Sequence, residues 1–137
     1  MAQLAHAQAF LAQLSAVMPS GYRLDIDDET LWLTSPDGGR AGSSSHWLTQ
    51  DVLLEEDVLV DAVQSLNQIQ REIAEETIEP WPAASGPEYR GFPEPGGQIV
   101  GDHLHLWFGD REEPVLELQP IDLADVILRD VSDRRGA

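Results

Sequence analysis

Two imidazoles, at positions 103 and 105, are the side chains of this sequence best suited to chemistry. His103 and His105 alternate with leucines, so a strand would point both rings to one side, with Asp102 just before them. Two imidazoles and a carboxylate can hold a transition metal, and Glu117 on the neighbouring predicted strand could lie nearby. The competing interpretation is the solvent-facing side of a strand. We favour it, and we expect no cofactor and no metal.

Three other chemical motifs are incomplete. The hydroxyls of 43–45 precede His46, but nucleophilic catalysis also needs an orienting carboxylate and an oxyanion hole, and no G-x-S-x-G elbow occurs. A calcium loop starting at Asp25 would require Gly at its sixth position and Glu at its twelfth, where Thr30 and Pro36 stand. No Gly-rich phosphate loop occurs either. We therefore predict that the protein is not an enzyme.

Aromatic side chains point to a recognition surface instead. Trp32 and Trp107 fall on the outward parity of their predicted strands, where exposed aromatic rings often mark a binding surface. Trp81, Tyr89 and Phe92 lie in a loop rich in Pro and Gly. We predict that these five residues contact a partner. The alternative is that a loop, such as the one with Trp81, simply covers the two strand tryptophans.

The charge of the sequence excludes several partners. The 137 residues carry 8 basic and 25 acidic side chains, a net charge of −17, with no Lys and no Cys. Nucleic acid and anionic membranes need clustered cations, and disulfides or thiolate metal sites need cysteine. No hydrophobic run is long enough to span a bilayer and no secretory signal is apparent, so we expect a cytoplasmic protein. The acidic surface is predicted on the long helix, at Glu55, Glu56, Asp57 and Asp61, whereas the first helix is uncharged.

The elements that must position these residues follow from hydrophobic periodicity. Helical spacing predicts helices over 2–17, 55–79 and 122–131, and alternation predicts strands over 22–27, 30–34, 43–48, 98–100, 103–108 and 115–119. The order α-β-β-(β)-α-β-β-α predicts an α+β fold, an antiparallel sheet with helices packed on one face. Residues 1–131 form one domain in this interpretation, with a Pro/Gly-rich loop at 80–97 and a polar tail at 132–137.

This order of elements, together with the size and acidity of the chain, resembles the type III secretion chaperones and the related YbjN-like domains. The resemblance extends over nearly the whole chain but includes no diagnostic residue motif. It implies a small, acidic, non-enzymatic and commonly homodimeric protein that holds extended segments of a partner.

We therefore predict a chaperone-like protein-binding module whose partner is another protein, of basic character. The uncharged first helix could also pack in a homodimer interface without burying ions. One alternative is an inhibitor or immunity protein that blocks a basic toxin or nuclease with its acidic helix. A second alternative is a metal-dependent enzyme that uses His103 and His105.

Overall fold

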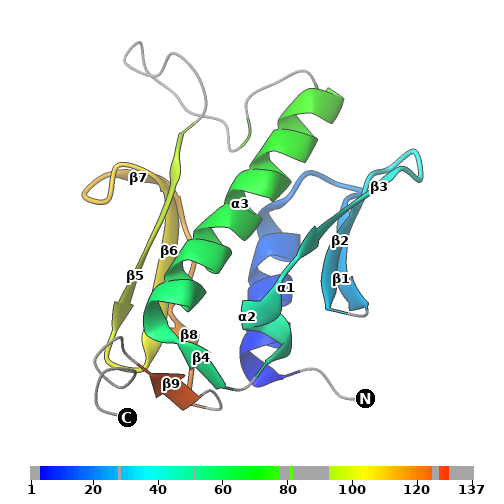
Figure 1. The fold of residues 1–137 in the computed structure, drawn as a ribbon. Coiled ribbons are helices and arrows are strands. Elements are labelled where there is room, and N and C mark those ends of the chain that lie inside the picture. The colour runs from blue at the N-terminus through cyan, green and yellow to red at the C-terminus, as the bar shows by residue number, and fades with distance from the viewer. Residues whose placement is uncertain are drawn as a thin grey trace.

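Two antiparallel sheets enclose a pair of helices in this protein. The structure, a computed structural model, describes residues 4–27, 29–50, 52–77, 81, 93–124 and 127–129. Helices α1 (Ala5–Val17) and α3 (Glu55–Thr77) lie in the middle, with one sheet on either side (Figure 1). The predicted α+β class, with antiparallel strands and packed helices, is confirmed, although the strands of the described residues divide among three sheets, two antiparallel ones and one short parallel pair.

The first sheet has an open edge that matters for the site. Its strands are β1 (Arg23–Asp27), β2 (Thr30–Thr34) and β3 (Arg40–Ser44), paired antiparallel in the order β1-β2-β3. Leu31 and Leu33 of β2 are buried and Trp32 between them is only half-buried, as the alternation predicts. Within the described chain β3 pairs only with β2, so its other side remains an edge.

The second sheet centres on β6. It contains β5 (Pro95–Val100), β6 (His103–Gly109), β7 (Pro114–Glu117) and the short β8 (Ile121–Asp122), and both β7 and β8 pair with β6. The inward side chains of β6 are Leu104, Leu106 and Phe108, all fully buried. They join one hydrophobic core with Phe10 and Leu14 of α1 and with Leu66, Ile69 and Ile73 of α3.

Two predicted elements are wrong. The third strand is β3, not 43–48, and His46–Thr49 is a short helix, α2, in which the adjacent Trp47 and Leu48 are both buried, against strand alternation. The helix predicted at 122–131 is replaced by β8 and by β9 (Ile127–Arg129), which pairs in parallel with β4 (Val52–Leu54). Asp122 accepts a hydrogen bond from the backbone N–H of Ala124, 2.8 Å away, which forms a turn instead of a helix cap.

The predicted loop at 80–97 is shorter than expected at its C-terminal end. Residues 95–97 belong to β5, although two of them are glycines. A Cβ on Gly96 would lie 2.8 Å from Nε1 of Trp107, its partner in the ladder, so a glycine is needed where the indole crosses the neighbouring strand. Residue 80, residues 82–92 and the predicted tail at 132–137 lie outside the described part of the chain.

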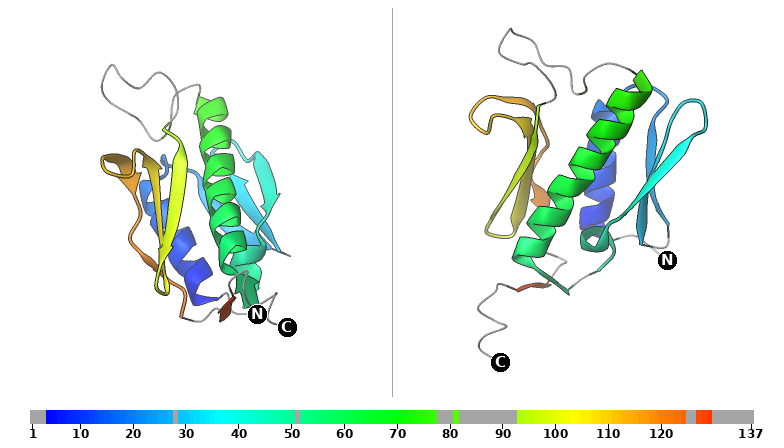
Figure 2. Two further views of the ribbon diagram at one scale, coloured as in Figure 1. Left: turned by 60° about the vertical axis from the view of Figure 1, so that its left-hand side comes forward. Right: turned by 45° about the horizontal axis from the view of Figure 1, so that its top comes forward.

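The arrangement of layers is clearest from a second direction. Figure 2 shows α3 running diagonally across the molecule, with the β1–β3 sheet on one side and the β5–β8 sheet on the other. None of the helices in the described residues is long and apolar enough to cross a membrane.

Candidate functional site

The two strand tryptophans are packed against their own sheets. The Trp32 ring lies over Gly42, its cross-strand partner, and the guanidinium of Arg40 lies 4.4 Å from the ring centroid. Trp107 repeats this arrangement with Gly96 on β5 and with Arg111, 5.7 Å away. An aromatic ring that covers a strand glycine shields the exposed backbone, and a guanidinium over the ring adds a cation–π contact. Each half-buried indole therefore has a structural role.

The third candidate tryptophan is not on the surface. Trp81 is 9 % exposed, and its ring meets Phe108 edge-to-face with 5.5 Å between centroids. Because the core covers this indole, Trp81 offers a partner little exposed surface, and its contact with a partner stays a prediction. Trp81 does not cover the strand tryptophans either, since Arg40 and Arg111 occupy that place. Tyr89 and Phe92 lie outside the described residues.

The fourth tryptophan, Trp47, had no predicted role and anchors the core. Its side chain is fully buried, with its ring 4.9 Å from Phe10, and its indole N–H donates to Ser65 Oγ at 3.2 Å. The carbonyl of Trp47 accepts a 2.6 Å hydrogen bond from Nε2 of buried His6. The uncharged first helix thus places its imidazole on a backbone partner within the same chain.

The two imidazoles at 103 and 105 have different surroundings. His103 Nδ1 lies 2.9 Å from Asp102 Oδ1, and with Asp122 these residues bring potential ligand atoms within 4.8 Å of one another. His105 lines a separate hollow with Trp107 and Glu117. Among the described residues, the structure therefore groups His103 with two carboxylates and not with His105, and all three members of that group are exposed.

The acidic residues of α3 gather at its two ends. Glu55, Glu56 and Asp57 form its first turn, where the helix dipole favours negative charge, and Asp61 follows one turn later. Burial and the charge of Asp57 raise the pKa of Asp61. Between these acids and Glu72 the helix carries only one charge, that of Arg71. The acidic surface is thus divided, and its second part, near Glu72, borders a groove that the sequence did not reveal.

This groove runs between α3 and the open edge of β3. We call it the α3–β3 groove. Its three hollows adjoin one another: Ala41 and Glu72 line both the first and the second, and Ser43 and Gln68 line both the second and the third. The second is a narrow connection of about 10 Å³. The strand side offers small side chains, and the helix side offers a polar row at four-residue spacing, formed by Gln64, Gln68, Glu72 and Glu76.

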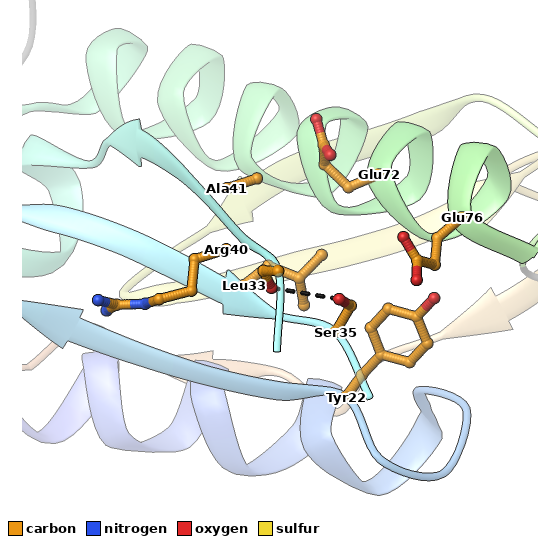
Figure 3. Close-up of a pocket in the computed structure, with 8 residues that line it drawn as sticks. Tyr22, Leu33, Ser35, Arg40, Ala41, Glu72 and Glu76 are labelled. Atoms are coloured by element: carbon orange, nitrogen blue, oxygen red, sulfur yellow. Dashed lines mark hydrogen bonds between the residues drawn. The ribbon is translucent and has the colours of Figure 1, made fainter. Parts of the chain in front are cut away.

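The acid end of the α3–β3 groove is a pocket of about 150 Å³ where three parts of the chain meet (Figure 3). Tyr22 comes from the α1–β1 connection, Ser35 and Gly39 come from the β2–β3 turn, and Glu72 and Glu76 come from α3. Figure 3 shows the Tyr22 hydroxyl pointing toward Glu76, and the Arg40 side chain leading away from both glutamates.

Short contacts hold these parts in place. Asp37 accepts hydrogen bonds from the hydroxyl of Ser35 and, at 3.0 Å, from the N–H of Gly39, and these two bonds lower the pKa of Asp37. The charge of Asp37 in turn raises the pKa of Glu76. Gln68 donates to Glu72 at 3.0 Å. The pocket therefore presents oxygen acceptors and negative charge.

The sequence contained one signal of this site. The row of polar residues from Gln64 to Glu76 has the period of a helix face and borders the buried stripe of Leu66, Ile69 and Ile73. What covers that row cannot be read from the row itself, because the neighbouring strand lies more than twenty residues earlier in the sequence.

No protein family model, curated protein sequence or solved structure matches this chain. The resemblance to type III secretion chaperones and YbjN-like domains accordingly stays a prediction.

Proposed function

We propose that the protein is a non-enzymatic binding module that holds an extended segment of a partner protein, of basic character, in the α3–β3 groove. The observation that carries the proposal is a row of three adjoining hollows beside an open strand edge. An extended segment that lies along such an edge gains backbone hydrogen bonds from the strand, while its side chains meet the opposite wall.

The dimensions of the two walls agree with this use. From Gln64 to Glu76 the helix rises by about 18 Å at ~1.5 Å per residue. A strand of five residues, the length of β3, extends about 17 Å at ~3.4 Å per residue. The groove is therefore long enough for roughly five extended residues of a partner, at the ~3.4 Å rise of an antiparallel strand.

Charge complementarity supports a basic partner. The net charge of the sequence is −17, and the helix wall ends in Glu72 and Glu76 with no ion-pair partner for either among the described residues. Opposite charge across an interface steers the encounter and accelerates association, and added salt screens this effect. We expect the association rate with a basic segment to fall as ionic strength rises.

Selection from a displayed library of random 12-residue peptides tests the proposal. Ser43→Trp and Gln68→Trp each place a large ring in the groove, one from either wall, whereas Val60→Trp adds the same ring at a position on α3 that is 55 % exposed. Peptides selected on the wild-type protein are expected to bind Val60→Trp equally well and to lose at least tenfold in affinity for both groove variants.

Two outcomes would contradict this function. Selected peptides that bind both groove variants as tightly as the wild type would place the binding surface elsewhere. If charge removal at Glu55, Glu56 and Asp57 abolished binding while the groove variants did not, the acidic start of α3 would be the interface, as the inhibitor alternative requires. Circular dichroism of each variant verifies that it is folded.

A further inference from the structure

The pocket at the acid end of the α3–β3 groove contains an unsatisfied polar group. Tyr22 is 8 % exposed, and its hydroxyl oxygen is buried without a hydrogen-bond partner among the described residues. A buried polar group with no partner costs about 1–3 kcal/mol, so such groups are rare unless a ligand satisfies them. Tyr22 lines the same pocket as Glu72 and Glu76, and Figure 3 shows its hydroxyl pointing toward Glu76.

The position of this hydroxyl is fixed by the local fold. Gly21, with φ at +93°, closes the end of α1, and a Cβ at this position would lie 2.9 Å from Cγ of Pro36. The α1–β1 connection therefore packs directly on the β2–β3 turn, which carries Asp37. Because a side chain at position 21 would force these two segments apart, the close contact directs Tyr22 across the gap toward α3 (Figure 3).

The same pocket has more negative charge than its own chain neutralises. Glu72 and Glu76 both line it, and the charge of Asp37 also acts on Glu76. The one basic residue in the lining is Arg40, whose guanidinium lies over Trp32 and leads away from both glutamates (Figure 3). Carboxyl groups held this close favour a cation from outside the chain.

We propose that this pocket binds an arginine side chain of the partner segment, with Glu72, Glu76 and the hydroxyl oxygen of Tyr22 accepting its N–H groups. The inference rests on the proposed function, since it names the residue that the acid end of the groove selects. A guanidinium offers five N–H donors in a planar fork, which suits two carboxylates and a hydroxyl better than the three donors of an ammonium group.

The size and geometry of the pocket favour a side chain over other cations. Its volume of about 150 Å³ is smaller than the ~300 Å³ at which pockets for small organic ligands begin. The glutamates are not part of a metal-sized cluster, because the one group of described residues with ligand atoms within 4.8 Å of one another is Asp102, His103 and Asp122. A side chain delivered by a bound segment is therefore the best-matched occupant.

The test uses N-acetyl-L-arginine N-methylamide as a probe of the full chain, followed by amide chemical shifts in NMR. We expect the largest shifts at residues 21–22, 35–39 and 72–77. The citrulline analogue, which has the same shape without the charge, is expected to cause no such shifts. The lysine analogue should bind at least threefold more weakly than the arginine probe.

Three variants then assign the contacts. Tyr22→Phe removes only the unpaired hydroxyl, so it should fold normally and weaken probe binding about three- to tenfold, the range expected for one hydrogen bond. Glu76→Gln should weaken it about tenfold. Glu75→Gln removes the same charge from the adjacent residue, which lines a different hollow with Asn67 and Arg71, and should stay within twofold of the wild type.

Several results would overturn the inference. Chemical-shift changes located elsewhere would overturn it, and so would equal binding of the citrulline analogue. An unchanged affinity of Tyr22→Phe for the probe would also overturn it, because the Tyr22 hydroxyl would then be bonded to Glu76 and not to the probe. If selected peptides bind in the groove without an arginine preference, the proposed function stands and the arginine pocket falls. If the arginine probe binds but no selected peptide binds in the groove, the pocket recognises arginine and the proposed function fails.

Discussion

Replacing Gly42 with alanine should reveal how strongly the Trp32 ring depends on a bare backbone beneath it. A Cβ on Gly42 would lie 2.8 Å from Cζ3 and 2.9 Å from Cε3 of Trp32, and 2.9 Å from Cγ2 of Thr30. All three distances are shorter than real Cβ contacts allow. The indole must therefore swing off the strand, and Arg40 loses its position 4.4 Å from the ring centroid.

The change in the free energy of unfolding follows from two costs and one gain. Forcing an extra methyl group into a packed contact costs about 1–3 kcal/mol. Losing the exposed cation–π contact adds about 0.5–1 kcal/mol. Alanine recovers about 0.4–1 kcal/mol because it restricts the unfolded chain more than glycine does. We expect Gly42→Ala to lower the free energy of unfolding by roughly 2 kcal/mol, within a range of about 0.5–3.5 kcal/mol, once these terms are combined.

Urea denaturation in a double-mutant cycle measures this effect. In a Trp32→Thr background the two contacts with the ring are gone and only the 2.9 Å contact with Cγ2 of Thr30 remains, so Gly42→Ala should destabilise the protein by at least about 1 kcal/mol less than in the wild type. The difference between the two backgrounds is the coupling between ring and glycine. An equal effect of Gly42→Ala with and without the indole would refute the reasoning, and a changed m-value would point to the unfolded state instead.

Three further predictions concern the core, the pocket and the exposed cluster. Ser65→Ala leaves the buried indole N–H of Trp47 without its acceptor and should lower the free energy of unfolding by about 1–2 kcal/mol in urea denaturation. The neighbouring Asp37 raises the pKa of Glu76, so the folded state binds the proton of the Glu76 carboxyl more tightly than the unfolded chain does. The stability from this protonation is fully present below the ordinary pKa of Glu and is lost as pH rises through the raised pKa of the folded state. Glu76→Gln should therefore raise the melting temperature at pH 7, with no gain near pH 4. Added Mn²⁺ should broaden NMR signals of His103 before those of His105, since only His103 has two carboxylates beside it.

Each of these three predictions can be contradicted by a specific result. A Ser65→Ala variant as stable as Gln64→Ala, its exposed neighbour, would mean that the indole N–H needs no serine. A gain for Glu76→Gln that persists unchanged at pH 4 would show that its charge is not the cause. Broadening that begins at His105 would disprove the grouping of His103 with the carboxylates.

The fold was largely predictable because its elements follow local periodicity. The alternation around Trp32 and Trp107 and the helical stripe of α3 each place apolar residues on one face, and burial follows those faces. The wrong predictions occurred where the local hydrophobic pattern and pairing with a distant strand favoured different structures. Residues 122–131 have a helical pattern, but β8 finds its partner in β6 and β9 finds its partner in β4.

The candidate site was much less predictable. Trp32 and Trp107 were predicted to bind a partner because they are large and on the outward parity of their strands, yet each covers a glycine of its own sheet. The role of Gly42 and Gly96 could not be predicted from the sequence, since a glycine in a strand resembles a loop residue until its cross-strand neighbour is known. Tyr22 was read only as the start of a strand, although its hydroxyl is the unpaired group in the pocket.

The sequence alone determined the charge, the absence of cysteine and lysine, and most of the helices and strands, because these depend on composition and on contacts a few residues apart. Only the tertiary structure decided that α3 lies beside the edge of β3 and that Tyr22, Asp37 and Glu76 converge. The physical reason is that burial patterns state which face of an element is covered but not by what. Packing between distant segments decides what covers each face, and it places Glu72 and Glu76 of α3 at the edge of an open pocket (Figure 3).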